Sequence, residues 1–248
     1  MGYNKLNHVF LIIDGNRRYA KKIQIPFEES YRLGAEKVTQ AIKWILKDND
    51  ADHLTIFGLA LSNLMGRQAS EIRPVLDSQE KTFRSWLDDD FLKNIRINFI
   101  GKIKDDAFMK KVTGFSFPES YVNACRALEE KTSKNSGKTL NILIAYGGSV
   151  DALDAQKRFA LHALEKRKNI ADSINLEIAP SFDFYDHTGP EIDLIIRTSE
   201  TRPLSDGPAH LCYFSEFVSI NKFWPEIEKE DIDEAISIFY NKDRRRGS

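Results

Sequence analysis

A carboxylate, a glycine and two arginines follow the first predicted strand without a gap. The apolar run at residues 8–13 leads directly into Asp14, Gly15, Asn16, Arg17 and Arg18. In parallel sheets, ligands collect at the carboxyl ends of the strands. Gly15 lets the backbone approach an anion closely, and the N–H groups after it can donate to diphosphate oxygens. Asp14 suits Mg²⁺, which prefers carboxylate and phosphate oxygens. An Asx-type turn beside a solvated basic flank is the alternative interpretation of this segment alone.

A second group of anion-binding residues follows the predicted strand at residues 192–197. It contains Arg197, Arg202 and Ser205, and Glu216 comes shortly after them. A guanidinium donates two parallel hydrogen bonds to a phosphate, so two arginines with nearby hydroxyl groups can hold a diphosphate. By composition alone, a surface salt-bridge network explains such an arginine pair equally well.

The elements that position these residues alternate between strand and helix. The predicted strands span residues 8–13, 53–59, 95–100, 139–145 and 192–197, with a short last strand near 212–214. The predicted helices span residues 28–47, 71–87, 119–131, 151–166 and 230–240, and residues 166–190 are expected to form a loop with a short helix. This alternation favours βαβ units. We therefore expect one α/β domain over residues 1–248, with a mainly parallel central sheet flanked by helices.

The composition narrows the class of protein further. The 248 residues are 42% hydrophobic and 29% charged, with a net charge of -1, which gives no general attraction to nucleic acid or anionic lipid. The two cysteines, Cys125 and Cys212, have no metal-site spacing, and the first residues lack a signal-peptide pattern. We therefore expect a cytoplasmic protein. No apolar run approaches the roughly 18 residues that span a bilayer, so contact with lipid would be peripheral.

Five segments occur in order between residues 8 and 236: HVFLIIDGNRRYAKK, LTIFGLALSN, LNILIAYGG, DLIIRTSETRPLSD and FWPEIEKEDIDEAI. They resemble the motifs of the cis-prenyltransferase family, the family of undecaprenyl diphosphate synthase, and the resemblance extends over nearly the whole chain. The ending Arg-Arg-Gly at residues 245–247 also resembles a family element that reaches a diphosphate in the neighbouring subunit. The resemblance implies the family fold, a homodimer and a Mg²⁺-dependent enzyme. Such an enzyme ionises an allylic prenyl diphosphate and transfers the prenyl group, most simply to isopentenyl diphosphate in cis-polyprenyl elongation.

The resemblance also implies a role for each matching residue. Asp14 would bind Mg²⁺ and assist ionisation, Glu216 would help to hold the metal, and Asn63 would be the catalytic asparagine. Gly15, Asn16, Arg17, Arg18 and Arg67 would bind the donor diphosphate, while Arg197, Arg202 and Ser205 would bind the diphosphate of the acceptor. Arg245 and Gly247 would form the cross-subunit contact. Ile42, Ile45, Leu46, Leu76 and Phe83 could line a tunnel for the prenyl tail, although each is equally suited to an ordinary core.

Several residues depart from the family motifs. Arg17 stands where the family has glycine, Tyr19 where it has tryptophan, and Phe27 and Tyr31 where it has arginine and histidine. The second motif carries Ala60, Ser62 and Leu64 in place of serine, glutamate and tryptophan, and residues 207–211 replace Phe-Leu-x-Trp-Gln. These changes affect the walls and the acceptor contacts more than the residues that bind metal and diphosphate.

Three functions therefore stay open from the sequence. The first is repeated addition of isopentenyl diphosphate. The second keeps allylic ionisation but makes one transfer to an alcohol-type acceptor or couples two short prenyl units irregularly. The third is a non-catalytic partner subunit, which the retained Asp14, Asn63 and Arg197 disfavour because an inert subunit needs no metal carboxylate.

Overall fold

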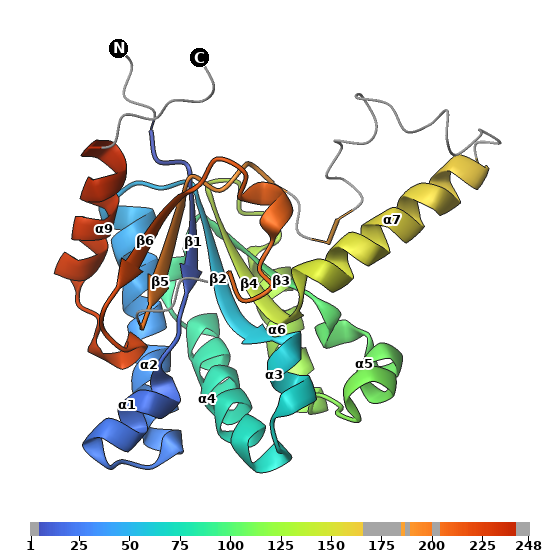
Figure 1. Cartoon of the computed structure of the whole chain (residues 1–248), viewed down its shortest axis with the longest axis horizontal. Helices are drawn as coiled ribbons and strands as arrows, with labels where there is room; N and C mark the ends of the chain where they lie inside the picture. Colours follow the sequence, from blue (N-terminus) through green and yellow to red (C-terminus); the bar gives the residue numbers. More distant parts are fainter. Residues whose placement is uncertain (1–4, 166–184, 187–188, 200–203, 242–248) are drawn as a thin grey trace.

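The computed structural model describes residues 5–165, 185–186, 189–199 and 204–241, and these residues form one six-stranded sheet flanked by helices (Figure 1). The strands are β1 (His8–Ile12), β2 (His53–Ala60), β3 (Ile95–Ile100), β4 (Lys138–Tyr146), β5 (Leu194–Thr198) and β6 (Glu216–Ile220). Their order across the sheet is β3-β4-β2-β1-β5-β6, and every neighbouring pair is parallel. The predicted α/β class and parallel sheet are confirmed.

The helices follow the predicted alternation closely. They are α1 (Asn16–Ile23), α2 (Phe27–Ile42), α3 (Leu61–Gly66), α4 (Ala69–Leu87), α5 (Asp106–Thr113), α6 (Glu119–Thr132), α7 (Gly148–Glu165) and α9 (Lys229–Asn241). A π-helical segment, Lys43–Asp48, continues α2 to the end of the helix expected at 28–47. The prediction omitted α1, α3 and α5, which are only 8, 6 and 8 residues long and therefore show little periodicity.

The last strand lies a few residues beyond its predicted place near 212–214. Tyr213 and Phe214 are exposed, and the Ser215 N–H donates to the Cys212 carbonyl over 3.3 Å, which closes a turn. The aromatic side chains that suggested a strand therefore belong to the connection before β6.

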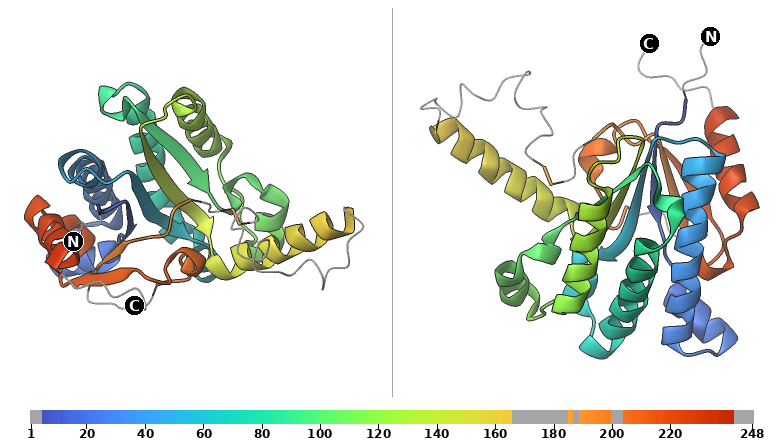
Figure 2. Two further views of the ribbon diagram at one scale, coloured as in Figure 1. Left: turned by 90° about the horizontal axis from the view of Figure 1, so that it is seen from above. Right: turned by 180° about the vertical axis from the view of Figure 1, so that it is seen from behind.

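Two apolar clusters hold the sheet from both sides. The larger one packs α2, α4, α6 and α9 against one face, which the right view of Figure 2 shows with α2, α4 and α6 in front of the strands. The smaller one lies on the opposite face and includes Phe10, Phe57, Ile195 and Leu211. Every residue of β1 is consequently buried, as expected for a parallel strand covered on both faces. Helix α7 extends away from the sheet (Figures 1 and 2).

Among the described helices, none is long and apolar enough to cross a membrane.

Candidate functional site

Asp14 lies at the carboxyl end of β1, beside the end of β5. The two strands are in register so that Ile12 pairs with Arg197. The Asp14 N–H donates to the Thr198 hydroxyl over 2.9 Å, and that hydroxyl donates to the Asp14 carbonyl over 2.7 Å. The Trp224 N–H donates to the same carbonyl over 3.0 Å. These contacts fix the backbone from which the Asp14 carboxylate projects.

Two arginines converge on the Asp14 carboxylate. Arg197 Nη2 donates to Oδ2 over 3.0 Å, and Arg18 Nη2 lies 3.3 Å from the same oxygen. Oδ1 accepts the N–H of Gly15 over 2.7 Å. The Arg197 side chain is 5% exposed, whereas that of Arg18 is 51% exposed. One carboxylate thus joins a buried cation from β5 to a surface cation from α1.

Ser205 orients the buried arginine. Its Oγ accepts from Arg197 Nη1 over 2.7 Å, while Nη2 donates to Asp14. The two terminal nitrogens of Arg197 therefore have separate partners, and the plane of its guanidinium is fixed. The structure brings together Asp14, Arg18, Arg197 and Ser205 from the two segments that the sequence singled out.

Gly15 makes the turn from β1 into α1. Its φ of 108° lies in the left-handed region, and a Cβ at this position would come within 2.8 Å of Phe223 Cδ1. Because α1 starts at Asn16, the N–H groups of its first turn have no carbonyl partner within the helix. The turn therefore presents N–H donors and the positive end of a helix beside Asp14.

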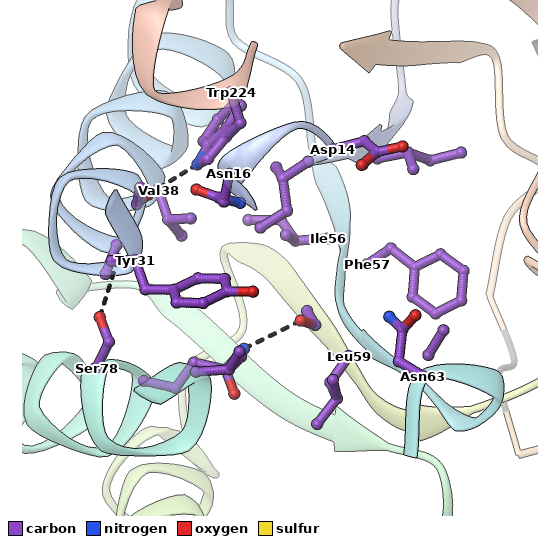
Figure 3. Close-up of a pocket in the computed structure, with 18 of the residues that line it drawn as sticks. Asp14, Asn16, Tyr31, Val38, Ile56, Phe57, Leu59, Asn63, Ser78 and Trp224 are labelled. Atoms are coloured by element: carbon purple, nitrogen blue, oxygen red, sulfur yellow. Dashed lines mark hydrogen bonds between the residues drawn. The ribbon is translucent and has the colours of Figure 1, made fainter. Parts of the chain in front are cut away.

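Gly34 of α2 makes room for the side chain of Asn16. A Cβ on Gly34 would lie 2.4 Å from Asn16 Oδ1, and Trp224 Nε1 donates to the Gly34 carbonyl over 2.8 Å. Asn16 Oδ1 is buried and accepts no hydrogen bond from any described residue. Figure 3 shows the Asn16 amide between Trp224 and Val38 at one side of the cavity.

A cavity of about 520 Å³ opens beside Asp14 and extends between the sheet and the helices α2 and α4 (Figure 3). The basic residues that line it are Arg17, Arg18, Lys21, Arg67 and Arg197. The apolar residues that line it include Val38, Ile56, Leu59, Val75, Phe83 and Trp86. The volume is typical of a site for one small organic ligand. Its lining suits a molecule with an anionic head and an apolar tail.

Aromatic side chains close the inner end of the cavity. Trp86 Nε1 donates to Thr39 Oγ1 over 2.9 Å, and the rings of Phe83 and Trp86 lie 5.6 Å apart. Phe99 packs behind Phe83 at 4.9 Å, and Phe91 packs behind Trp86 at 5.8 Å. The cavity therefore ends at a packed aromatic cluster.

Four of the five predicted tunnel residues are core residues instead. Ile42, Ile45, Leu46 and Leu76 are at most 1% exposed and do not line the cavity, whereas Phe83 does. The polar residues Ser78, Gln79 and Thr82 line the cavity from α4 and were missed. They interrupt the apolar pattern of that helix, which is a usable signal for a cavity wall.

Arg17 and Tyr31, which replace family residues, both line the cavity. Arg17 forms an ion pair with Glu71 and so links α1 to the first turn of α4. The Tyr31 ring points into the cavity (Figure 3). Burial raises the pKa of Tyr31, and the cations of Arg67 and Arg17 oppose that rise. Burial also lowers the pKa of Arg67.

Asn63 and Arg67 reach the cavity from the segment that follows β2. Asn63 lies on α3, which follows β2 directly, and Arg67 caps the end of that helix. Both line the cavity. The structure therefore gathers the predicted residues from residue 14 to residue 67 around one space.

Glu216 does not join this group within one chain. It pairs with Leu194 at the start of β5, while Ile220 at the other end of β6 pairs with Thr198 beside Asp14. Four strand residues separate the two levels by about 13 Å, so Glu216 and Asp14 lie too far apart within one chain to bind the same ion, and a role for Glu216 in metal binding stays a prediction. No three His, Cys, Asp or Glu side chains gather as a metal cage in the described part of the chain. Arg202, Arg245 and Gly247 lie outside the described residues.

Comparison with known proteins covers almost the whole chain. The family model described as "Putative undecaprenyl diphosphate synthase" matches residues 12–247. The chain is 30% identical to a tritrans,polycis-undecaprenyl-diphosphate synthase (geranylgeranyl-diphosphate specific) of Pyrobaculum aerophilum, over 97% of this chain and 95% of the relative. It is also 30% identical to an isoprenyl transferase of Clostridium acetobutylicum, over 97% and 89% of the two chains.

Two solved structures share the fold. The lavandulyl diphosphate synthase of Lavandula x intermedia, solved with dimethylallyl diphosphate, superposes with a TM-score of 0.85 at 24% identity, over 98% of this chain and 99% of the other. A probable undecaprenyl diphosphate synthase of Campylobacter jejuni gives a TM-score of 0.74 at 20% identity, over 99% and 100%.

Proposed function

The chain belongs to the undecaprenyl diphosphate synthase family of prenyltransferases, and from that premise we propose that it transfers the prenyl group of an allylic diphosphate to isopentenyl diphosphate. The observation that carries this proposal is the Asp14 carboxylate between Arg18 and Arg197, at the mouth of a cavity with an apolar inner end. The cations and the cavity match the two halves of a prenyl diphosphate.

The diphosphate of the donor is held at the start of α1. The N–H groups after Gly15 and the side chain of Arg18 donate to its oxygens, and Arg67 contributes charge from the other side of the cavity. Breaking the allylic carbon–oxygen bond leaves a delocalised cation and a strongly negative leaving group. Donors that are fixed in place before the reaction stabilise that negative charge.

The diphosphate of the acceptor is held by Arg197 and Ser205. Arg197, near the end of β5, donates to the hydroxyl of Ser205 and also to the carboxylate of Asp14. Since Arg18 and Arg197 meet at the same carboxylate, the two diphosphates bind side by side. The reacting carbons of donor and acceptor are thereby brought close together, which removes most of the entropy cost of their encounter.

Mg²⁺ fits the carboxylate of Asp14. This ion is often bound through one or two carboxylates together with substrate phosphates, so a single aspartate beside a diphosphate site is a sufficient protein ligand. When bound, Mg²⁺ neutralises part of the charge on the departing diphosphate. Arg18 and Arg197, which contact Asp14, would donate to phosphate oxygens beside the metal.

The test is to incubate the purified protein with Mg²⁺ and a panel of allylic diphosphates, with and without isopentenyl diphosphate and simple alcohols. Mass spectrometry then identifies the products. Adducts that grow by isopentenyl units support elongation. Adducts formed only with alcohols, or from the allylic diphosphates alone, would replace elongation by the corresponding alternative. If no product forms under any condition, the proposal is contradicted.

We also propose that the active form is a homodimer. Helix α7 extends from the body and exposes Leu153, Leu161 and Leu164, an apolar surface suited to a second copy. Light scattering at micromolar concentration should give the mass of two chains, and a monomer would contradict this.

Release of an apolar product brings the protein into peripheral contact with a membrane surface.

A further inference from the structure

Asp206 connects the diphosphate site to the first turn of α7. Its Oδ1 accepts the N–H of Ser149 over 2.9 Å, and its Oδ2 accepts the Ser149 hydroxyl over 2.9 Å. Its carbonyl accepts the N–H of Gly148 over 2.7 Å. A residue 57 positions further along the chain thus satisfies helix N-terminal donors that have no partner within the helix.

The backbone at Asp206 has a conformation that the hydrogen bonds from the first turn of α7 must stabilise. Ser205 and Asp206 have φ values of 53° and 60°, so two consecutive residues with side chains occupy the left-handed region. Such residues persist where their surroundings fix them. The three hydrogen bonds from α7 supply that fixation one residue away from Ser205.

The fit between this loop and α7 is also steric. A Cβ on Gly147 would lie 2.6 Å from Asp206 Oδ2, and a Cβ on Gly148 would lie 2.2 Å from the Gly207 carbonyl oxygen. The loop therefore rests directly on the helix backbone. Any side chain at Gly148 would push the loop away.

We propose that Asp206 is a positioning residue for the acceptor diphosphate, acting through Ser205 on Arg197. The chain of contacts runs from Ser149 and Gly148 through Asp206 to the neighbouring Ser205, whose hydroxyl holds Arg197 Nη1. Arg197 Nη2 then points at Asp14. When the cap is lost, the Ser205 hydroxyl moves and the buried guanidinium loses its fixed orientation. The proposal rests on the proposed function for the identity of the ligand.

The experiment measures the binding of inorganic diphosphate by calorimetry and the kinetic constants for isopentenyl diphosphate. Asp206→Ala should weaken diphosphate binding about 10-fold or more and raise the acceptor KM by a similar factor, with a smaller change in kcat. Asp206→Asn should stay within about 3-fold of the unmodified protein, because the asparagine oxygen can still accept the Ser149 N–H, its amide can donate to the Ser149 hydroxyl oxygen, and asparagine tolerates the left-handed conformation.

Two further variants separate positioning from a general loss of stability. Gly148→Ala displaces the loop while it leaves Asp206 intact, and it should reproduce the weak diphosphate binding of Asp206→Ala. Asp154→Ala removes a carboxylate that holds the same helix through Lys102, away from Ser205, and should bind diphosphate normally. Circular dichroism and thermal unfolding establish that each variant is folded.

Unchanged diphosphate affinity in a folded Asp206→Ala protein would overturn the proposal. Equal losses in Asp206→Asn and Asp206→Ala would also overturn it, since charge would then act in place of geometry. Diphosphate binding does not require turnover. A protein that binds diphosphate through this chain of contacts but makes no prenyl product would therefore refute the proposed function alone.

Discussion

In the proposed function, Asp14 is the residue on which the chemistry depends most directly. Asp14→Ala should lower turnover by at least about 100-fold, because it removes the metal carboxylate and the group that aligns both arginines. The protein should remain folded, since the side chain of Asp14 is 38% exposed and Arg197 keeps its hydrogen bond to Ser205.

Asp77→Ala is the matched control for this change. Asp77 is an exposed carboxylate that is paired with an arginine, Arg73, on α4 and lies outside the cavity. Steady-state rates of both variants with an allylic diphosphate and isopentenyl diphosphate provide the comparison. Near-normal turnover of a folded Asp14→Ala protein would remove the central role of this residue.

Gly15 is a second residue whose identity is required by its surroundings, here by its backbone conformation and by a close neighbour. Gly15→Ala should destabilise the protein by about 1–3 kcal/mol, because its φ of 108° and the contact with Phe223 both exclude a Cβ. Gly66→Ala is the control, since a Cβ there meets nothing within 4 Å. Urea unfolding of the two variants should therefore differ, and equal midpoints would show that the turn adapts.

The sequence predicted which residues gather around the cavity better than it predicted their partners. Asp14 and Arg197 were assigned to different substrates, yet they form a direct ion pair. That pair depends on β1 and β5 being neighbours, and no local pattern reveals this because Asp14 and Arg197 are 183 positions apart in the sequence. Glu216 shows a related limit. Its place in the family motif is recognisable, but the register of β6 against β5 places it away from Asp14.

At the scale of elements, β1 and β4 were predictable because they are largely buried and rich in apolar residues, and each was placed to within one residue at both ends. The cavity was not predictable in the same way. Apolar residues occur on α4 both where it faces the core and where it faces the cavity, so residue type does not distinguish Leu76 from Phe83.

The aromatic end of the cavity should limit the length of the prenyl tail. Phe83→Leu removes ring volume from the inner wall, so longer products should appear in the mass spectrum at the expense of shorter ones. Phe91→Leu is the control, since Phe91 belongs to the same aromatic cluster but does not line the cavity. Each change should cost about 1–2 kcal/mol of stability. Identical product lengths in both variants would show that the tail leaves the cavity by another route.

At the scale of the whole molecule, a buried histidine at the start of β1 joins three segments of the chain. His8 of β1 contacts the Pro190 carbonyl through Nδ1 at 2.9 Å and the Thr55 hydroxyl of β2 through Nε2 at 2.8 Å. Burial lowers the pKa of His8 from its ordinary 6.5 to about 4. The neutral imidazole is therefore the form that the folded protein requires.

The stability of the protein should consequently fall as the pH is lowered. The unfolded chain takes up a proton at His8 near pH 6.5, whereas the folded chain resists it until about pH 4, so acid favours unfolding between these values. Between pH 7 and pH 5 this one residue should remove about 2 kcal/mol from the free energy of unfolding. Urea unfolding across that range measures the loss.

His8→Gln cannot titrate and should lack most of this pH dependence. His53→Gln changes a half-buried histidine whose pKa is also lowered, and it should keep the pH dependence that His8 causes. If the free energy of unfolding of His8→Gln has the same pH dependence as that of the unmodified protein, then groups other than His8 cause the loss of stability in acid.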